Sequence, residues 1–179
     1  IVLATKFGHA DVTLPGTQEW GPKGGRTYIR NACEASLTRL RTDHIDLYQQ
    51  HTPDPSVPIE ETLGALTELV QEGKVRYIGH SNFSAAEAVA AEAASAGAGG
   101  ARFVSAQNEF NLLARTAERD LLPTLRRLGV GLLPYFPLAN GLLTGKYSRD
   151  HRPEGTRIVD DKPQLLESVD WDRLAAYER

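Results

Sequence analysis

The sequence contains no methionine, not even at position 1, and only one cysteine, Cys33. A chain that begins Ile-Val-Leu-Ala-Thr-Lys without an initiating methionine is expected to be a segment of a longer protein. A single cysteine cannot form an internal disulfide, which excludes a disulfide-stabilised fold. Because Cys33 shares helical spacing with Ile29, Leu37 and Leu40, we predict that it is a buried structural thiol.

Long hydrophobic runs and an excess of positive charge are also missing. The wholly apolar stretches are only a few residues long, far short of the roughly 20 residues that span a bilayer. The N-terminus shows no signal-peptide pattern. The net charge is −3, and the basic residues are dispersed among acidic ones, so no basic stripe is available to neutralise phosphates. We therefore expect a cytoplasmic protein with neither a membrane nor a nucleic-acid partner.

Several catalytic and ligand-binding signatures are absent. Residues 16–23 imitate a phosphate-binding loop, but Pro22 stands where that motif needs lysine. The glycines of residues 97–102 lack the third glycine of the dinucleotide fingerprint, and they precede a predicted strand instead of following one. There are no paired cysteines, no His-Glu-x-x-His and no Gly-x-Ser-x-Gly. We therefore predict neither a metal site nor a serine-hydrolase site.

The sequence does contain an alternation of short aliphatic runs with longer stretches of helical spacing. This alternation is typical of βα units on a parallel sheet and predicts an α/β fold of about five units. A length of 179 residues with 41% hydrophobic content suits a single domain over residues 1–179. The predicted strands cover residues 1–6, 44–50, 75–80, 103–107 and 130–135.

The helices are predicted from apolar spacing and from signals at their ends. The first covers about residues 26–41. The second has apolar residues on one face over residues 59–70 and ends at Gly73. Ser84 and Glu87 form a capping box that opens an Ala-rich third helix.

Helical and loop signals continue in the C-terminal third. The fourth helix covers about residues 121–128 and ends at Gly129. Residues 148–163 are rich in Arg, Asp and Gly, and we expect a polar loop there. A helical tail is expected from residue 164 onward.

A polar side chain lies at or just after the end of every predicted strand. In a (β/α) barrel the carboxyl ends of the strands form one rim, and that rim holds the active site. Each residue alone has a structural explanation, such as solvation of a strand-end lysine, but their coincidence at one rim favours a functional site. The set lacks the carboxylate pair of a glycoside hydrolase. Its members are Lys6, His51, Ser81, Asn82, Gln107, Asn108 and Tyr135.

Several segments closely resemble the aldo-keto reductase superfamily, in the correct order and spacing. By this resemblance the chain runs from the third to just past the seventh strand of the family's eight-stranded barrel. It therefore implies an incomplete (β/α)8 TIM barrel, without the first, second and eighth strands. The matching segments are ATK at 4–6, TDHIDLYQQH at 42–51, IGHSNF at 78–83, AQNEFN at 106–111 and PYFPLANGLLTGKY at 134–147.

The resemblance implies a reaction. The family reduces aldehydes and ketones with a nicotinamide dinucleotide, while a tyrosine supported by a lysine, an aspartate and a histidine protonates the carbonyl oxygen. Lys6 and His51 match the lysine and the histidine. The family's aspartate and tyrosine follow its second strand and would precede residue 1. An ammonium beside a phenol lowers the pKa of the phenol, which is the role implied for Lys6. A neutral His51 would orient the substrate carbonyl.

The resemblance also implies a cofactor site. Ser81, Asn82 and Gln107 correspond to the clamp on the nicotinamide carboxamide. Tyr135 corresponds to the aromatic residue that stacks on the nicotinamide ring. In the loop after it, Leu138 and Gly141 would approach the pyrophosphate. The cofactor-binding candidates in this loop are Phe136, Pro137, Leu138 and Gly141.

Two positions depart from the family pattern, and several questions stay open. Phe136 replaces a small hydroxyl residue, and His80 stands where an aliphatic residue is common. NADP(H) is the expected cofactor, with NAD(H) left open because the family reads the 2′-phosphate after its eighth strand. The alternative is a cofactor-binding, redox-sensing accessory subunit with little turnover. We expect a small-molecule carbonyl substrate, a monomer, and an inactive fragment when residues 1–179 are produced alone. Trp20 either lines the substrate pocket or packs within its own loop.

Overall fold

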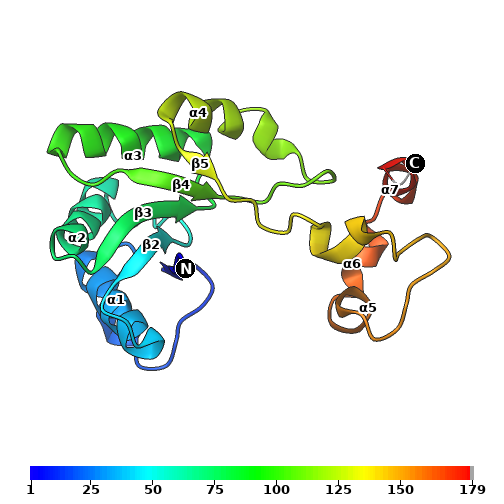
Figure 1. The fold of residues 1–179 in the computed structure, drawn as a ribbon, viewed down its shortest axis with the longest axis horizontal. Coiled ribbons are helices and arrows are strands. Elements are labelled where there is room, and N and C mark those ends of the chain that lie inside the picture. The colour runs from blue at the N-terminus through cyan, green and yellow to red at the C-terminus, as the bar shows by residue number, and fades with distance from the viewer. Residues whose placement is uncertain (178–179) are drawn as a thin grey trace. The chain divides into compact units, whose positions relative to one another are not determined.

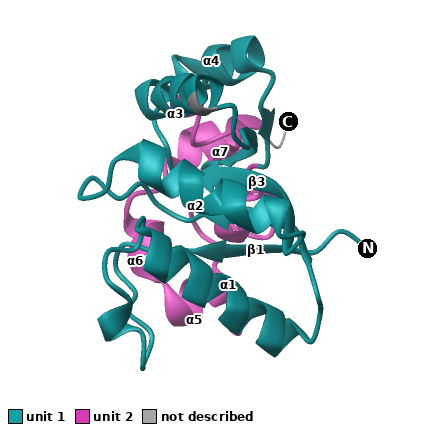
Figure 2. Ribbon diagram, turned by 90° about the vertical axis from the view of Figure 1, so that its left-hand side faces the viewer, with its two compact units in different colours: residues 1–108, 118–133 teal, residues 109–117, 134–179 magenta. Residues whose placement is uncertain are grey.

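The computed structural model describes residues 1–177, and the chain divides into two compact units. Unit 1 comprises Ile1–Asn108 and Glu118–Leu133. Unit 2 comprises Glu109–Ala117 and the chain from Pro134 onward (Figure 2). Each unit has a hydrophobic cluster of its own. The expectation of one partial barrel domain over residues 1–179 stays a prediction.

Unit 1 is built on a five-stranded parallel sheet. The strands lie in chain order, and each pairs in parallel with the next (Figure 1). Parallel neighbours require a crossover connection, and helices supply it here. This arrangement confirms the predicted α/β class with strands and helices in alternation. The strands are β1 (Ala4–Phe7), β2 (Ile45–Gln50), β3 (Val75–Ser81), β4 (Phe103–Gln107) and β5 (Gly131–Leu132).

The helices of unit 1 begin and end close to the predicted residues. The capping box is present, because Ser84 Oγ accepts a hydrogen bond from the Glu87 N–H at 3.2 Å and Glu87 Oε2 accepts one from the Ser84 N–H at 2.7 Å. Gly73 has a φ of 73°, the left-handed conformation that ends a helix and that glycine adopts without strain. The helices are α1 (Arg26–Leu40), α2 (Ile59–Gln71), α3 (Ala85–Ala98) and α4 (Leu121–Leu128), with a 3-10 turn, η1, at Gln18–Trp20.

The core of unit 1 lies between the sheet and helices α1, α2 and α3. Ile29, Tyr48 and Leu66 are fully buried in it, and burial of such a side chain contributes about 1.5–3 kcal/mol. Cys33 is also fully buried, as predicted for a structural thiol. Burial raises the pKa of the Cys33 thiol to about 11, so the thiol stays protonated and unreactive at neutral pH.

The first and last strands differ from the prediction. The first begins at Ala4, because Ile1 and Val2 are exposed to solvent. The last was predicted over residues 130–135 but covers only Gly131–Leu132. The Leu133 N–H still donates to the Ala106 carbonyl at 2.8 Å, but the next residue is Pro134, which has no N–H to continue the ladder.

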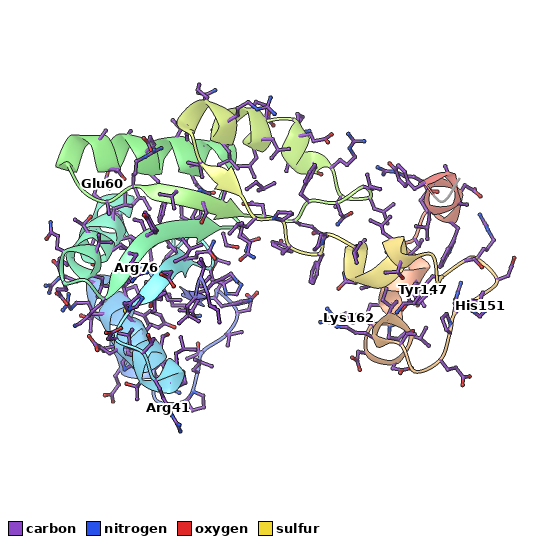
Figure 3. All side chains as sticks on the ribbon, in the orientation of Figure 1. Arg41, Glu60, Arg76, Tyr147, His151 and Lys162 are labelled. Atoms are coloured by element: carbon purple, nitrogen blue, oxygen red, sulfur yellow. The ribbon has the colours of Figure 1, made fainter. Side chains whose placement is uncertain are left out.

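Unit 2 contains short helices and connecting turns. Tyr147, labelled in Figure 3, is 2% exposed, and the fully buried Ile158 belongs to the same cluster. The polar loop predicted over residues 148–163 is wrong in its last third, which forms helix α5, because a helical turn there buries Ile158. The predicted tail is interrupted at residues 168–170. The elements are η3 (Ala139–Thr144), α5 (Arg157–Asp161), α6 (Gln164–Glu167) and α7 (Trp171–Tyr177). The short turn η2 (Thr116–Glu118) begins in unit 2 and ends at Glu118 of unit 1.

Candidate functional site

The predicted rim residues of unit 1 lie at the carboxyl ends of its strands. Ser81 pairs in register with Gln107, at the carboxyl ends of β3 and β4. His51 directly follows β2, and its N–H donates to the Phe7 carbonyl at the end of β1, at 2.8 Å. The parallel register therefore brings Lys6, His51, Ser81, Asn82 and Gln107 to the same end of neighbouring strands.

Lys6 and His51 line one cavity of about 310 Å³. The ring of His9 lies edge-on to the ring of His51, with 4.4 Å between centroids. Burial, followed by the charges of His9 and Lys6, lowers the pKa of His51 below its ordinary value. The imidazole is therefore neutral at neutral pH and has one ring N–H to donate.

The same cavity has an aromatic wall. Trp20 of η1 lines it together with Tyr28 of α1. The two rings meet edge to face, with 5.6 Å between centroids. Trp20 therefore packs against α1 and borders the space beside Lys6 and His51, while its role toward a substrate stays a prediction.

Ser81, Asn82 and Gln107 are joined by hydrogen bonds. Ser81 Oγ and the Asn82 N–H both donate to the Gln107 carbonyl, at 2.7 and 3.1 Å. Asn82 Nδ2 donates to the His51 carbonyl at 2.9 Å and to Ser81 Oγ at 3.1 Å. Asn82 has a φ of 61°, a left-handed conformation that asparagine tolerates better than most residues. This network holds the backbone of His51 against the three amide and hydroxyl residues.

One polar atom of this group has no partner. Gln107 Oε1 is buried and makes no hydrogen bond within residues 1–177. A buried carbonyl oxygen without a donor costs about 1–3 kcal/mol, so the side chain is suited to a ligand that brings an N–H. Among the described residues Asn108 Oδ1 likewise has no partner, whereas its Nδ2 donates to the Phe83 carbonyl at 3.1 Å.

The other predicted cofactor residues lie in unit 2. Tyr135 forms an isolated parallel bridge with Glu109, and burial, with a smaller effect of Glu109, raises its pKa. The Tyr135 and Phe136 rings meet edge to face at 5.3 Å. Phe136 has a φ of 51°, and its carbonyl accepts a hydrogen bond from Asn111 Nδ2 at 3.0 Å. The ammonium of Lys162 lies 5.6 Å from the Phe136 ring centroid.

The loop after Phe136 presents backbone and apolar surface to solvent. Pro137 is exposed, and Leu138 is 54% exposed. The Gly141 N–H donates to the Leu138 carbonyl at 2.8 Å, which closes a tight turn. Gly141 has a φ of 105°, which side chains rarely tolerate. The turn therefore needs glycine at this position.

The structure adds residues that the sequence pattern did not single out. His9 belongs to a loop, and only its ring contact with His51 assigns it to the cavity. Its position three residues after the strand-end Lys6 is a weak signal. His80, noted as a departure, is 1% exposed and packs between the rings of Phe83 and Phe103.

Within residues 1–177, no group of three or more His, Cys, Asp or Glu side chains could hold a metal ion. No helix in that range is long and apolar enough to cross a membrane.

The comparison with known proteins agrees with this geometry. The model of the aldo/keto reductase family matches residues 1–176. The chain belongs to the aldo/keto reductase family. It is also 38% identical over 179 residues to a curated protein of Glycine max named "Probable aldo-keto reductase 1". That match covers 100% of this chain and 49% of the relative, so the chain spans about half the length of the curated relative.

Family membership relates the sheet to a larger architecture. The aldo/keto reductases are oxidoreductases that generally depend on NAD(P)H, and their fold is a TIM barrel. The five parallel strands with intervening helices are accordingly part of such a barrel. The resemblance noted in the sequence is thus confirmed as a family relationship, while the role of each site residue stays a prediction.

Proposed function

We propose that the whole protein reduces aldehydes or ketones to alcohols with NADP(H). The observation that carries this proposal is the placement of Lys6 and His51 in one cavity, with His51 tied by its backbone to the Ser81, Asn82 and Gln107 network. An ammonium, a neutral imidazole and a set of amide groups can assist a carbonyl reduction whose hydride comes from the dinucleotide and whose proton comes from the family's tyrosine.

Lys6 and His51 assist a proton transfer whose donor is the family's tyrosine. His51 donates its ring N–H to the substrate carbonyl oxygen and fixes the direction of the carbonyl. The ammonium of Lys6 stabilises the phenolate form of the tyrosine that the family uses as proton donor, which brings the tyrosine pKa toward neutrality. His9 supports a neutral His51, because a second imidazole in ring contact disfavours the imidazolium.

The cofactor fit rests on the unpartnered oxygen of Gln107. A nicotinamide carboxamide has an NH₂ group to donate to Gln107 Oε1 and a carbonyl oxygen to accept from an amide or hydroxyl. When bound, the nicotinamide dinucleotide supplies the hydride. Ser81, Asn82 and Gln107 would hold the carboxamide. In unit 2, Tyr135, Phe136, Pro137, Leu138 and Gly141 are proposed to contact the cofactor.

The first experiment measures NADPH-dependent reduction of benzaldehyde by the full-length protein. We expect Lys6→Met and His51→Ala each to lower kcat by about 10²–10⁴-fold, as for loss of an acid–base group. The matched control is His44→Ala, because His44 lies just before β2, at the opposite end of that strand from His51. Undiminished reduction in either site variant contradicts the proposed roles.

A second experiment separates the reductase from the accessory-subunit alternative. We expect Gln107→Leu to raise the Kd for NADPH about tenfold, because the carboxamide loses its acceptor. Fluorescence titration of NADPH into the full-length protein measures this value. Tight binding of NADPH without turnover of any of several aldehydes and ketones would favour the redox-sensing alternative.

A further inference from the structure

Another cavity, of about 160 Å³, lies in unit 1 beside the loop that follows β2. It is bordered by this loop and by the N-terminal parts of α2 and α3, and its lining shares no residue with the cavity at Lys6 and His51. Its walls are mostly apolar. They include Pro53, Val57, Ile59, Phe83 and Ala90.

A buried amide lines this cavity. Gln50, the last residue of β2, is only 2% exposed. Its Oε1 is buried and has no hydrogen-bond partner within residues 1–177. An amide oxygen left without a donor costs about 1–3 kcal/mol, so a ligand with an N–H or O–H would remove this penalty.

The other polar groups of the lining are acidic or already bonded. Asp54 Oδ2 accepts from the Gly24 N–H at 2.8 Å, and Thr62 Oγ1 donates to the Gly24 carbonyl at 2.7 Å. Glu87 lines the cavity and uses Oε2 in the capping box. None of the residues that line the cavity is basic. The polar lining thus offers acceptors and negative charge to a ligand.

We propose that this cavity binds a small primary amine as its ammonium form. The apolar body of the amine fits between the proline, valine, isoleucine and phenylalanine walls, and the ammonium donates to Gln50 Oε1 in a cavity whose lining also includes Asp54 and Glu87. The size agrees, because an apolar cavity of about 150 Å³ takes a molecule as large as benzene. The acidic residues and the lack of basic ones in the lining favour a cation over a neutral or anionic molecule of equal size.

Three matched probes test the proposal on the full-length protein. Benzylamine, benzyl alcohol and benzoate have the same ring and differ in the charge of the polar group. In calorimetric or NMR titrations we expect benzylamine to bind about tenfold more tightly than benzyl alcohol, since its hydrogen bond is charge-assisted. Benzoate should not bind. Equal affinities, a preference for benzoate, or no binding of any probe because only water fills the space would each overturn the proposal.

Three variants locate the binding. Gln50→Leu removes the acceptor and should weaken benzylamine about tenfold. Ala90→Leu fills the cavity from another wall and should abolish binding of both benzylamine and benzyl alcohol, whether or not Gln50→Leu folds. Glu87→Gln preserves a capping box, which accepts Glu or Gln, and should reduce only the preference for the amine. If Ala90→Leu still binds benzylamine, the amine binds elsewhere and the proposed site is refuted.

Discussion

Units 1 and 2 hold their candidate residues in different ways. In unit 1 the rim residues follow the strands of a hydrogen-bonded parallel ladder, flanked by helices of 8 to 15 residues. In unit 2 the helices α5, α6 and α7 have 5, 4 and 7 residues, and the candidate segment turns through positive φ at Phe136, Ala139, Asn140 and Gly141. In a regular strand ladder the pairing register determines where each side chain lies. In an irregular segment the position of each side chain depends on the backbone conformation of single turns. The effect of a substitution should differ accordingly.

The largest expected difference concerns the two hydrophobic clusters. Leu66 in unit 1 and Ile158 in unit 2 are both fully buried. We expect Leu66→Ala to destabilise unit 1 by about 3–5 kcal/mol, because long helices and the sheet prevent collapse around the cavity. Ile158→Ala should destabilise unit 2 by only about 2–3 kcal/mol, since short helices relax more easily. Hydrogen exchange of the amides in each unit measures both losses of stability. A larger loss of stability for Ile158→Ala than for Leu66→Ala would contradict the expected difference between the units.

The same contrast explains what the sequence predicts well. Strands β2, β3 and β4 and helices α1 to α4 agree closely with the prediction, because their apolar periodicity, glycine stops and the Ser84 cap all point to the same bounds. Helix α5 was missed because only Ile158 and Val159 interrupt a polar stretch. The last strand was predicted too long because its aliphatic run conceals the effect of Pro134.

The candidate sites show a similar limit. Strand-end positions could be inferred from the pattern, so Lys6, His51, Ser81 and Gln107 were expected at one rim. The contact of His9 with His51 depends on a loop path that no periodicity encodes.

The buried amide of Gln50 marks the same limit. In the sequence, glutamine is typical of exposed positions. Its burial is visible only once α2 and α3 are packed beside it.

His80 makes the stability of unit 1 depend on pH. Burial lowers the pKa of His80 from its ordinary 6.5 to about 4. Between these values the unfolded chain binds a proton that the folded chain does not, so stability falls as pH drops from about 6.5 to about 4. The expected loss is about 3 kcal/mol. Urea unfolding at several pH values measures it.

Replacing one histidine in each unit tests whether His80 causes this acid-induced loss. His80→Phe should remove most of the acid-induced loss, because a neighbour of Phe83 and Phe103 then no longer titrates. His151→Phe should leave the loss in place, since His151 in unit 2 is exposed. An unchanged pH dependence in His80→Phe would assign the acid sensitivity to other groups.

The smallest expected effects come from one glycine in each unit. Gly141→Ala should destabilise unit 2 by about 1–2 kcal/mol, because a φ of 105° is strained for any residue with a Cβ, although the nearest atom, Tyr147 Cε2, is at an ordinary 3.8 Å. Gly64 lies within α2, and a Cβ there meets no atom within 4 Å. Gly64→Ala should therefore stabilise unit 1 by about 0.5–1 kcal/mol through helix propensity and a less flexible unfolded chain. Hydrogen exchange in each unit distinguishes the two signs, and a stabilising Gly141→Ala would show that the turn in unit 2 does not depend on its backbone conformation.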